Sequence, residues 1–283
     1  MMRRAVGAVL GTLGLAVHLV CSAALAAPDR APEPLLVFGA ASMTNALGEA
    51  ARVFETTTAA DVTLVFDATS RAARQMAAGA PAEVLVSAHA AWVDWFIACS
   101  RGDAATRRII AGNRLVVAVP RDEAGTGAAP GILEPASHLL RAQRFAIADP
   151  DGVPAGIYAR QALRSIGLWD AVSARVLRGD SVRTVLAWLE TGAVDAGIVY
   201  ASDAAASGRV TIGATIAPHT HDPIRYEAVA TLAAGETARG FIAFLADQAA
   251  QSTLAAHGFA PAGEERGAVA SQTASPAFGC GVP

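Results

Sequence analysis

The sequence contains no lysine, so all 22 of its basic residues are arginines. A chain without lysine cannot form a lysine Schiff base, and it cannot carry the Gly-x-x-x-x-Gly-Lys loop of a P-loop nucleotide site. Charged residues make up only 17% of the chain, and the formal net charge is −3. This balance argues against a nucleic-acid-binding surface and against a polybasic membrane patch.

Cysteine and histidine are also scarce, with three and six residues, and no Cys-x-x-Cys motif or Cys/His cluster occurs. The spacings typical of zinc sites are therefore missing. His219 and His221 form the only close histidine pair, in a segment of Thr, His, Asp and Pro. That composition indicates a surface loop rather than a metal site.

Long apolar runs are absent except near the N-terminus. Arg3 and Arg4 precede an apolar stretch over residues 5–20, and residues 24–26 read Ala-Leu-Ala. A basic start, an apolar centre and a small-x-small end are typical of a cleavable signal peptide. We expect residues 1–26 to be removed and the mature chain to be exported to the periplasm. A transmembrane anchor is the alternative, but no second long apolar stretch supports it.

The three cysteines leave two questions open. Lipoprotein processing at Cys21 is an alternative to cleavage after residue 26, although Val20 stands where a small residue is expected. Export permits a disulfide between Cys99 and Cys280. Two widely spaced cysteines do not require a bond, however, and Cys280 lies in a Gly/Ala/Ser/Pro-rich tail, so the sequence leaves the pairing undecided.

Short apolar runs alternate with helical patterns along the chain, which predicts an α/β fold with mainly parallel sheets flanked by helices. Two lobes suit 283 residues better than one, with a ligand cleft between them at the strand ends. The expected strands cover residues 35–38, 62–66, 84–87, 115–119, 145–148, 175–177, 196–200 and 225–230. The expected helices cover residues 44–54, 71–78, 90–97, 156–166, 182–191, 237–246 and 248–257.

The expected boundaries follow from this pattern. Residues 32–113 and 226–261 would form lobe I, and residues 114–225 would form lobe II, with an exposed Gly/Ala/Pro-rich loop at 121–135. Residues 262–283 are rich in Gly, Ala and Ser, and we expect a flexible tail there.

Four junctions between a strand and a helix could bind an anion. They lie at Ser42, at residues 67–71, at residues 153–156 and at residues 179–182. The first N–H groups of a helix have no partner within the helix, and they carry the positive end of its dipole. Simple capping explains any one junction, so the pattern alone leaves the ligand open.

An exported hydrolase is a second interpretation. Ser42 or Ser70 would then be the nucleophile, with His89, His138 or His219 as the base. No Gly-x-Ser-x-Gly segment is present, and none of these histidines lies in a recognisable partner motif.

Several motifs decide between these interpretations when they are taken in order. They are Phe-Gly-Ala-Ala-Ser-Met-Thr-Asn-Ala-Leu at 38–47, Gly-Ala-Pro-Ala-Glu-Val at 79–84, Asp-Pro at 149–150, Val-Pro-Ala-Gly-Ile-Tyr-Ala at 153–159, Gly-Leu-Trp-Asp at 167–170 and Gly-Ile-Val-Tyr-Ala-Ser-Asp at 197–203. With these motifs, residues 35–260 resemble the periplasmic molybdate-binding proteins of ABC transporters, which have a type II periplasmic-binding-protein fold. The resemblance covers nearly the whole mature chain.

The resemblance implies a set of neutral ligands for a tetrahedral oxyanion. Ser42 and Thr69 would donate a hydroxyl and a backbone N–H, and Tyr200 would donate its phenol. Ala155 and Val182 would donate backbone N–H groups only, which is why their side chains can be apolar. Charge-assisted hydrogen bonds from neutral donors are strong in a desolvated cleft.

The resemblance also implies the biological setting. The ligand would be molybdate and also tungstate, with molybdenum held only as the oxyanion and with no cofactor. The chain would be a monomer, not an enzyme, and would deliver its ligand to a separate membrane permease. Sulfate, phosphate or an organic anion on the same fold is the alternative ligand.

The sequence departs from the family pattern near the expected site. Thr69 stands where serine is usual, which keeps the hydroxyl and adds a methyl group. Asp67 and Arg71 replace small or uncharged residues, and their spacing of four allows an ion pair on a helix face. Glu83 replaces an aspartate, and His89 stands where an acidic or amide residue is common. These changes bear on affinity and selectivity rather than on the fold.

Overall fold

A computed structural model describes residues 33–121, residues 135–262 and Cys280. The expected signal peptide at 1–26, the loop at 121–135 except its ends, and all of the 262–283 tail except Ala262 and Cys280 lie outside the described residues. No helix among the described residues is both long enough and apolar enough to cross a membrane.

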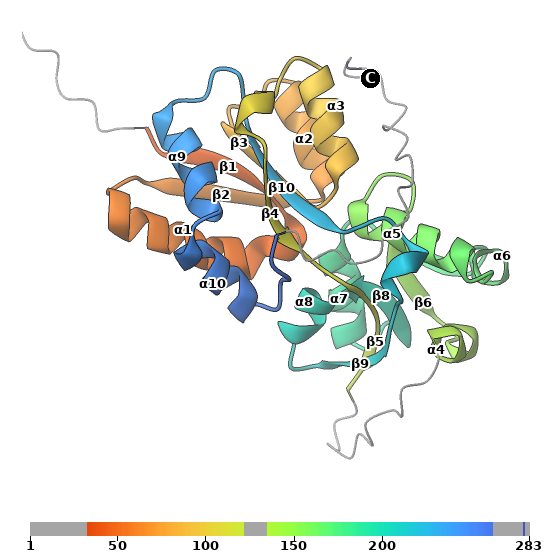
Figure 1. Ribbon diagram of the computed structural model, residues 1–283. Helices are drawn as coiled ribbons and strands as arrows, with labels where there is room; N and C mark the ends of the chain where they lie inside the picture. Colours follow the sequence, from red (N-terminus) through yellow and green to blue (C-terminus); the bar gives the residue numbers. More distant parts are fainter. Residues whose placement is uncertain (1–32, 122–134, 263–279, 281–283) are drawn as a thin grey trace, which may run out of the picture. The chain divides into compact units, whose positions relative to one another are not determined.

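The described chain builds two five-stranded sheets (Figure 1). The first has the strand order β2-β1-β3-β10-β4 and the second has the order β7-β6-β8-β5-β9. The strands of the first sheet are β1 (Leu35–Ala40), β2 (Val62–Asp67), β3 (Val84–Ser87), β4 (Arg108–Gly112) and β10 (Arg225–Ala230). Those of the second are β5 (Leu115–Pro120), β6 (Phe145–Ala148), β7 (Val176–Gly179), β8 (Ala196–Tyr200) and β9 (Val210–Thr215).

Both sheets have the same pattern of strand directions. In each, four strands run in one direction and a single strand, β10 or β5, is antiparallel to its neighbours. The chain passes from the first sheet to the second between β4 and β5, and it returns between β9 and β10. Two connecting segments therefore join the sheets.

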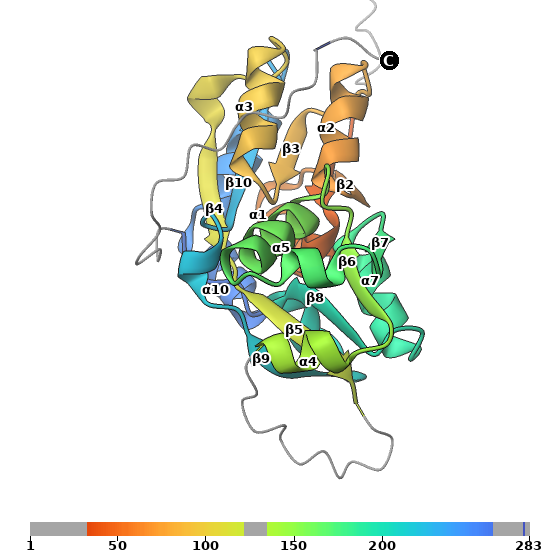
Figure 2. The same ribbon diagram turned by 90° about the vertical axis from the view of Figure 1, so that its right-hand side faces the viewer.

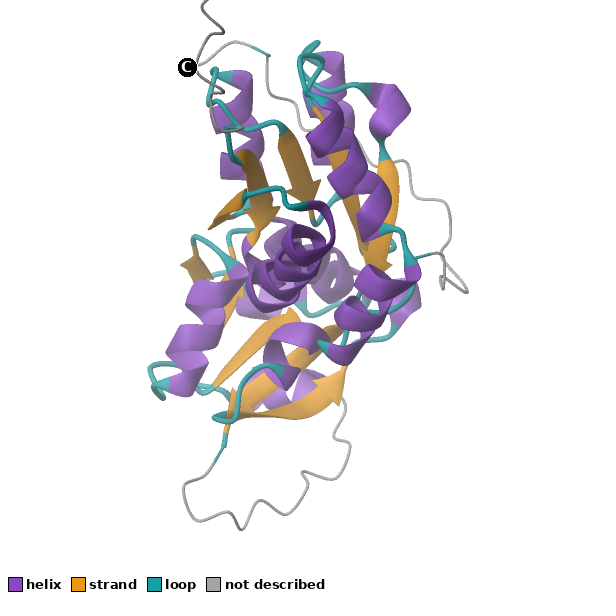
Figure 3. Cartoon of the chain, turned by 90° about the vertical axis from the view of Figure 1, so that its left-hand side faces the viewer, coloured by secondary structure: helices purple, strands orange, loops and turns teal. Residues whose placement is uncertain are grey.

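Helices cover both faces of each sheet (Figures 2 and 3). Around the first sheet, α1, α9 and α10 pack on one face and α2 and α3 on the other; around the second, α4 and α5 lie opposite α7 and α8. The bounds are α1 (Thr44–Thr58), α2 (Thr69–Ala77), α3 (Ala90–Ala98), α4 (Pro135–Arg141), α5 (Pro154–Ser165), α6 (Trp169–Val172), α7 (Val182–Glu190), α8 (Ala201–Ala205), α9 (Glu236–Leu245) and α10 (Gln248–Ala256). Three short 3-10 helices complete the set: η1 (Ala41–Met43), η2 (Ala104–Thr106) and η3 (Pro218–Thr220).

Burial explains why the short apolar runs are strands. Every residue of β3, β6 and β8 is buried, as expected for central strands with helices on both faces. The core on the α2/α3 side includes Phe38, Trp92 and Phe96, all buried. Apolar segments of four or five residues therefore suffice where both faces are covered.

The structure adds elements that the sequence pattern did not predict, namely β4, β9, α4, α6 and α8. Strand β4 begins with two exposed residues and β9 carries the exposed Ile212, so neither is buried along its whole length. Strand β4 pairs with β10, and β9 pairs with β5. Both pairs are antiparallel and join segments that are far apart in the sequence. Pairing of this kind leaves little trace in the local sequence.

The structure answers the open question about the cysteines, because Cys99 and Cys280 form a disulfide. Cys99 follows α3 directly, at the C-cap of that helix. The bond connects residues 181 positions apart and attaches the C-terminal segment to the first sheet's α3. The composition around Cys280 says little about pairing, because a disulfide requires only that the two cysteine side chains come within bonding distance in a suitable orientation.

The disulfide is expected to contribute measurably to stability. Cys280→Ser should lower the free energy of unfolding by about 2–4 kcal/mol, because the unfolded chain loses a long-range constraint. Urea unfolding of the oxidised protein and the variant measures this difference. Wild-type protein in reductant should match the variant, and equal midpoints for oxidised and reduced protein would contradict the prediction.

Candidate functional site

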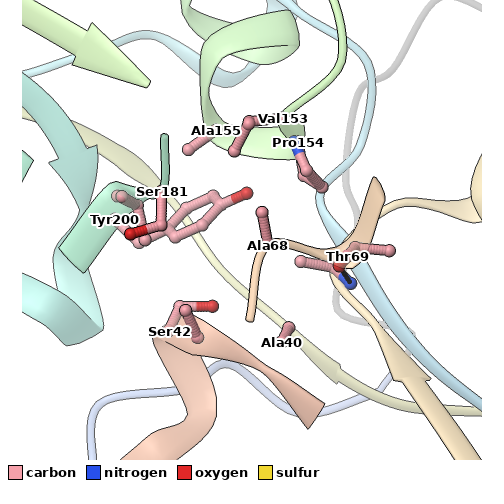
Figure 4. A pocket seen from close by; sticks show the side chains of 12 residues that line it. Ala40, Ser42, Ala68, Thr69, Val153, Pro154, Ala155, Ser181 and Tyr200 are labelled. Carbon is pink, nitrogen blue, oxygen red and sulfur yellow. Dashed lines mark hydrogen bonds between the residues drawn. The ribbon is translucent and has the colours of Figure 1, made fainter. Parts of the chain in front are cut away.

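A cavity between the two sheets brings together all five residues proposed from the sequence (Figure 4). It holds about 230 Å³ of space not filled by atoms. That space includes solvent at the mouth of the cavity, and the enclosed part between the lining side chains is small, so only a small ligand would fit there. Its lining consists of Ala40, Ala41, Ser42, Ala68, Thr69, Ala88, Val153, Pro154, Ala155, Ser181, Val182 and Tyr200.

Each proposed residue lies at the carboxyl end of a strand. Ser42 is in η1 directly after β1, and Thr69 is the first residue of α2 after β2. Ala155 is the second residue of α5, Val182 is the first of α7, and Tyr200 ends β8. Helices α2 and α5 begin two residues earlier than their patterns predicted. Thr69 and Ala155 therefore lie in the first helical turn, where N–H groups lack intrahelical partners.

Side-chain caps are missing at two of these helix starts. The residues before α2 and α5 are Ala68 and Val153, and neither makes a side-chain capping bond. Ser181 caps α7, but its hydroxyl accepts only from the Thr184 N–H. The earliest N–H groups of all three helices are thus left to a ligand in the cavity.

Gly156 sets the position of the α5 start. A Cβ at this residue would lie 2.1 Å from the Ala148 carbonyl oxygen and 2.5 Å from that of Asp149. Only glycine lets the helix approach the end of β6 this closely. The glycine of the Val-Pro-Ala-Gly segment therefore places the Ala155 N–H at the cavity.

The hydroxyl of Thr69 is oriented by the backbone. The Ala88 N–H donates to Thr69 Oγ1 over 3.0 Å, in a buried contact. Since this bond uses a lone pair of the oxygen, the hydroxyl proton stays available for an acceptor in the cavity. Thr69 is only 1% exposed, so that acceptor would also be shielded from water.

Ser42 is oriented by two residues that the sequence did not indicate. Its Oγ lies 2.8 Å from the phenol oxygen of Tyr226, which in turn accepts from Asn113 Nδ2 over 3.3 Å. Burial raises the pKa of Tyr226, so its phenol stays protonated and can donate to Ser42. Either oxygen can donate in this pair, and with Tyr226 as the donor the Ser42 proton is available to the cavity.

Tyr200 contributes a buried phenol with an unused proton. The side chain is 1% exposed, and its oxygen has no hydrogen-bond partner within the described part of the chain. The oxygen extends into the space between Ala155 and Ala68 (Figure 4). Burial raises the pKa of Tyr200 well above its usual value, with smaller contributions from nearby Tyr226, Tyr158 and Asp203. A buried donor without a partner is costly unless a ligand satisfies it.

The residues that line the cavity carry no charge. Asp67 and Arg71, which could have changed the charge at its rim, pair with each other over 2.8 Å as their spacing predicted. Arg71 also lies 3.7 Å from Asp180 of the opposite sheet's loop. These charges are satisfied outside the lining.

A second ion pair adjoins the site and was missed from the sequence. Arg183 Nε lies 2.7 Å from Oδ1 of Asp203, whose side chain is fully buried. The N–H is poorly aligned with that oxygen, so charge holds the pair more than hydrogen-bond geometry does. Burial raises the pKa of Asp203 to about 7, although Arg183 opposes this shift.

The residues proposed for a hydrolase do not form a nucleophile–base pair. Ser42 bonds to Tyr226 rather than to a histidine. His89 caps α3, with Nδ1 accepting from the Ala91 N–H over 3.2 Å. In the described ranges, no group of three or more His, Cys, Asp or Glu side chains could hold a metal ion. His219 is exposed in η3, whereas His221 is half-buried against the Tyr158 ring.

Comparison with known proteins agrees with this geometry. A family model described as bacterial extracellular solute-binding protein matches residues 35–260. The chain belongs to this family. The molybdate-binding protein ModA of Escherichia coli (strain K12) is 36% identical over 226 residues, which cover 80% of this chain and 88% of the relative. The protein of the same name from Haemophilus influenzae is 34% identical over 228 residues, covering 79% and 88%.

A solved structure shows the same fold. The periplasmic molybdate-binding protein of Azotobacter vinelandii superposes with a TM-score of 0.69 at 23% identity, covering 80% of this chain and 98% of that one. The two-lobed solute-binding fold expected from the sequence is confirmed. As a member of a solute-binding family, the chain is not an enzyme, and the hydrolase interpretation is set aside.

Gly156→Ala tests the close approach of α5 to β6 in this solute-binding protein. The added methyl group cannot fit against the two carbonyl oxygens, so the free energy of unfolding should fall by about 1–3 kcal/mol. Urea unfolding measures it. Gly240→Ala in α9 is the matched control, because nothing lies within 4 Å of its added Cβ. There a gain of about 0.5–1 kcal/mol is expected, and equal effects at both sites would refute the argument.

His89 makes a second prediction, on acid stability. Burial lowers its pKa from 6.5 to about 4, while Asp222 and Asp94 oppose the shift. Between these values the unfolded chain binds a proton that the folded chain does not, so stability falls as the pH drops from about 6.5 to 4. The loss should be about 3 kcal/mol.

His89→Asn is the variant that isolates this effect, because asparagine can still cap α3. Its free energy of unfolding, measured in urea from pH 7 to pH 4, should fall by about 3 kcal/mol less than that of the wild type. Parallel curves for the two proteins would show that His89 is not the group responsible.

Proposed function

We propose that this solute-binding protein captures molybdate, and also tungstate, for import by an ABC transporter. The observation that carries the proposal is the cavity lined by neutral donors from both sheets, among them the unpartnered phenol of Tyr200. The names of the curated relatives, at 34–36% identity over most of the chain, support the choice of oxyanion.

The proposed ligands divide the work between hydroxyl and backbone groups. Ser42, Thr69 and Tyr200 donate their hydroxyl protons, and Ser42 and Thr69 add backbone N–H groups. Ala155 and Val182 donate backbone N–H groups from the starts of α5 and α7. The positive ends of the helix dipoles favour a dianion there. Without a cation in the lining, no buried charge stays uncompensated when the ligand leaves.

Capture in this proposal is a closure of two lobes on the ligand. Lobe I comprises residues 32–113 and 226–261, and lobe II comprises residues 114–225. Ser42 and Thr69 then belong to lobe I, whereas Ala155, Val182 and Tyr200 belong to lobe II. An oxyanion that contacts both lobes binds the closed form better and shifts the population towards it.

The setting of this capture is also part of the proposal. The chain works as a periplasmic monomer after removal of residues 1–26, and a membrane permease recognises the closed form. ATP is hydrolysed by another chain, because this sequence has no Gly-x-x-x-x-Gly-Lys loop. No cofactor takes part.

Isothermal titration of the mature protein with molybdate, tungstate, sulfate and phosphate tests the proposal. Molybdate and tungstate should bind at micromolar concentration or below with one site per chain. Tyr200→Phe should weaken molybdate binding by about 1–3 kcal/mol, because one charge-assisted bond is lost.

Ser70→Ala is the matched control for this titration. It removes a buried hydroxyl next to Thr69 that does not line the cavity, so its affinity should equal that of the wild type. Absence of heat with molybdate, together with binding of sulfate or phosphate, would assign the site to another oxyanion. An unchanged affinity in Tyr200→Phe would remove Tyr200 from the ligand set.

A further inference from the structure

Arg183 touches three parts of the proposed site at once. It follows Val182 in α7, and its Nε lies 2.7 Å from Asp203 Oδ1 in α8, three residues after Tyr200. Its Nη2 donates to the Ser42 carbonyl oxygen over 3.2 Å. A longer contact, of 3.3 Å, joins Nη1 to Asn45 Oδ1.

These contacts cross from one sheet to the other. Arg183 and Asp203 lie in helices that pack on the second sheet, whereas Ser42 and Asn45 follow the end of β1 in the first. The bonds from Arg183 to Ser42 and Asn45 therefore exist only while the two sheets are this close. The ion pair between Arg183 and Asp203 lies entirely on the side of the second sheet, so it does not depend on how close the two sheets are.

We propose that Arg183 is a positioning residue that holds the lobes closed around the bound oxyanion. This inference rests on the proposed function for its ligand. By donating to the Ser42 carbonyl, the guanidinium fixes η1, so that the Ser42 hydroxyl and N–H face the cavity. Asp203 neutralises the guanidinium charge from the opposite side.

The buried carboxylate of Asp203 determines which variant is informative. Arg183→Met alone would leave the fully buried Asp203 without its cation, and the free protein would be destabilised because that group must then take up a proton or stay charged without a partner. The double variant Arg183→Met with Asp203→Asn removes both charges. It should restore the stability of the free protein while the contacts to Ser42 and Asn45 stay lost.

The release rate of bound molybdate separates positioning from a purely structural role. Exchange of radiolabelled molybdate into excess unlabelled molybdate should be about 10-fold faster in the double variant than in the wild type, because loss of interface contacts acts mainly on dissociation. Asn45→Ala leaves the ion pair intact and should accelerate release by a smaller factor. Release at the wild-type rate from the double variant would overturn the inference.

A matched pair of charges controls for the loss of an ion pair as such. Arg144 and Asp195 pair over 2.8 Å beside the second sheet, and among the residues that the structure describes their bonds stay on that side. Arg144→Met with Asp195→Asn should release molybdate at the wild-type rate. Faster release from this control, equal to that of the Arg183 variant, would contradict a specific role.

A measurement without ligand decides the inference independently of molybdate. Spin labels at Gln75 of α2 and Ser165 of α5 report the separation of the two sides of the cleft. The Arg183/Asp203 double variant should populate longer distances than the wild type and the Arg144/Asp195 control. Identical distributions would refute the positioning role, whereas failure of the wild type to bind molybdate would refute only the proposed function.

Discussion

The first backbone N–H groups of α2, α5 and α7 have no carbonyl partner within their own helices, and the site depends on where the two sheets place them. All three helices follow strands whose carboxyl ends meet at one cavity. Alanine and valine before α2 and α5 leave these groups without side-chain caps. Gly156 has no Cβ, and this lets the start of α5 contact the end of β6. An apolar segment can therefore line a polar site, since its backbone supplies the chemistry.

Charge is arranged around this neutral cavity rather than inside it. Arg71 pairs with Asp67, and Arg183 pairs with the buried Asp203. Both arginines also reach the opposite sheet, as does Trp92, whose Nε1 donates to the Gly152 carbonyl over 3.0 Å. The two arginines that bridge the cleft are thus cations already balanced by a carboxylate on their own side. The interior keeps only dipoles, which can stabilise an anion without creating an uncompensated charge after its release.

Most of the central strands could be predicted from the sequence, because burial on both faces leaves short apolar runs. The five candidate ligands followed from the resemblance to a known family rather than from local pattern, and they line one cavity. What escaped prediction depends on contacts between distant segments. Tyr226 reads as part of a crossing strand, and only the fold brings it 2.8 Å from Ser42. In the sequence, Arg183 is an ordinary polar position on a helix. Its contacts with Asp203 and Ser42 appear only in the fold. The disulfide of Cys280 stayed undecided from the sequence for the same reason, since tail composition carries no information about a partner 181 positions away.

The orientation of the hydroxyl groups limits which anions the proposed site accepts. Thr69 already accepts from the Ala88 N–H, so its hydroxyl proton is available to the cavity. Ser42 offers its proton as well when the Tyr226 phenol is the donor in their pair. Tyr200 presents a third. A fully deprotonated tetrahedral dianion offers only acceptors and matches this set. Hydrogen phosphate retains an O–H that needs an acceptor, and the lining has no carboxylate to provide one. Sulfate is also a dianion that offers only acceptors, so discrimination between sulfate and molybdate depends on the size of the cavity. Thr69 lines the cavity and carries a methyl group that serine lacks, so among the proposed ligands its bulk bears most directly on that size.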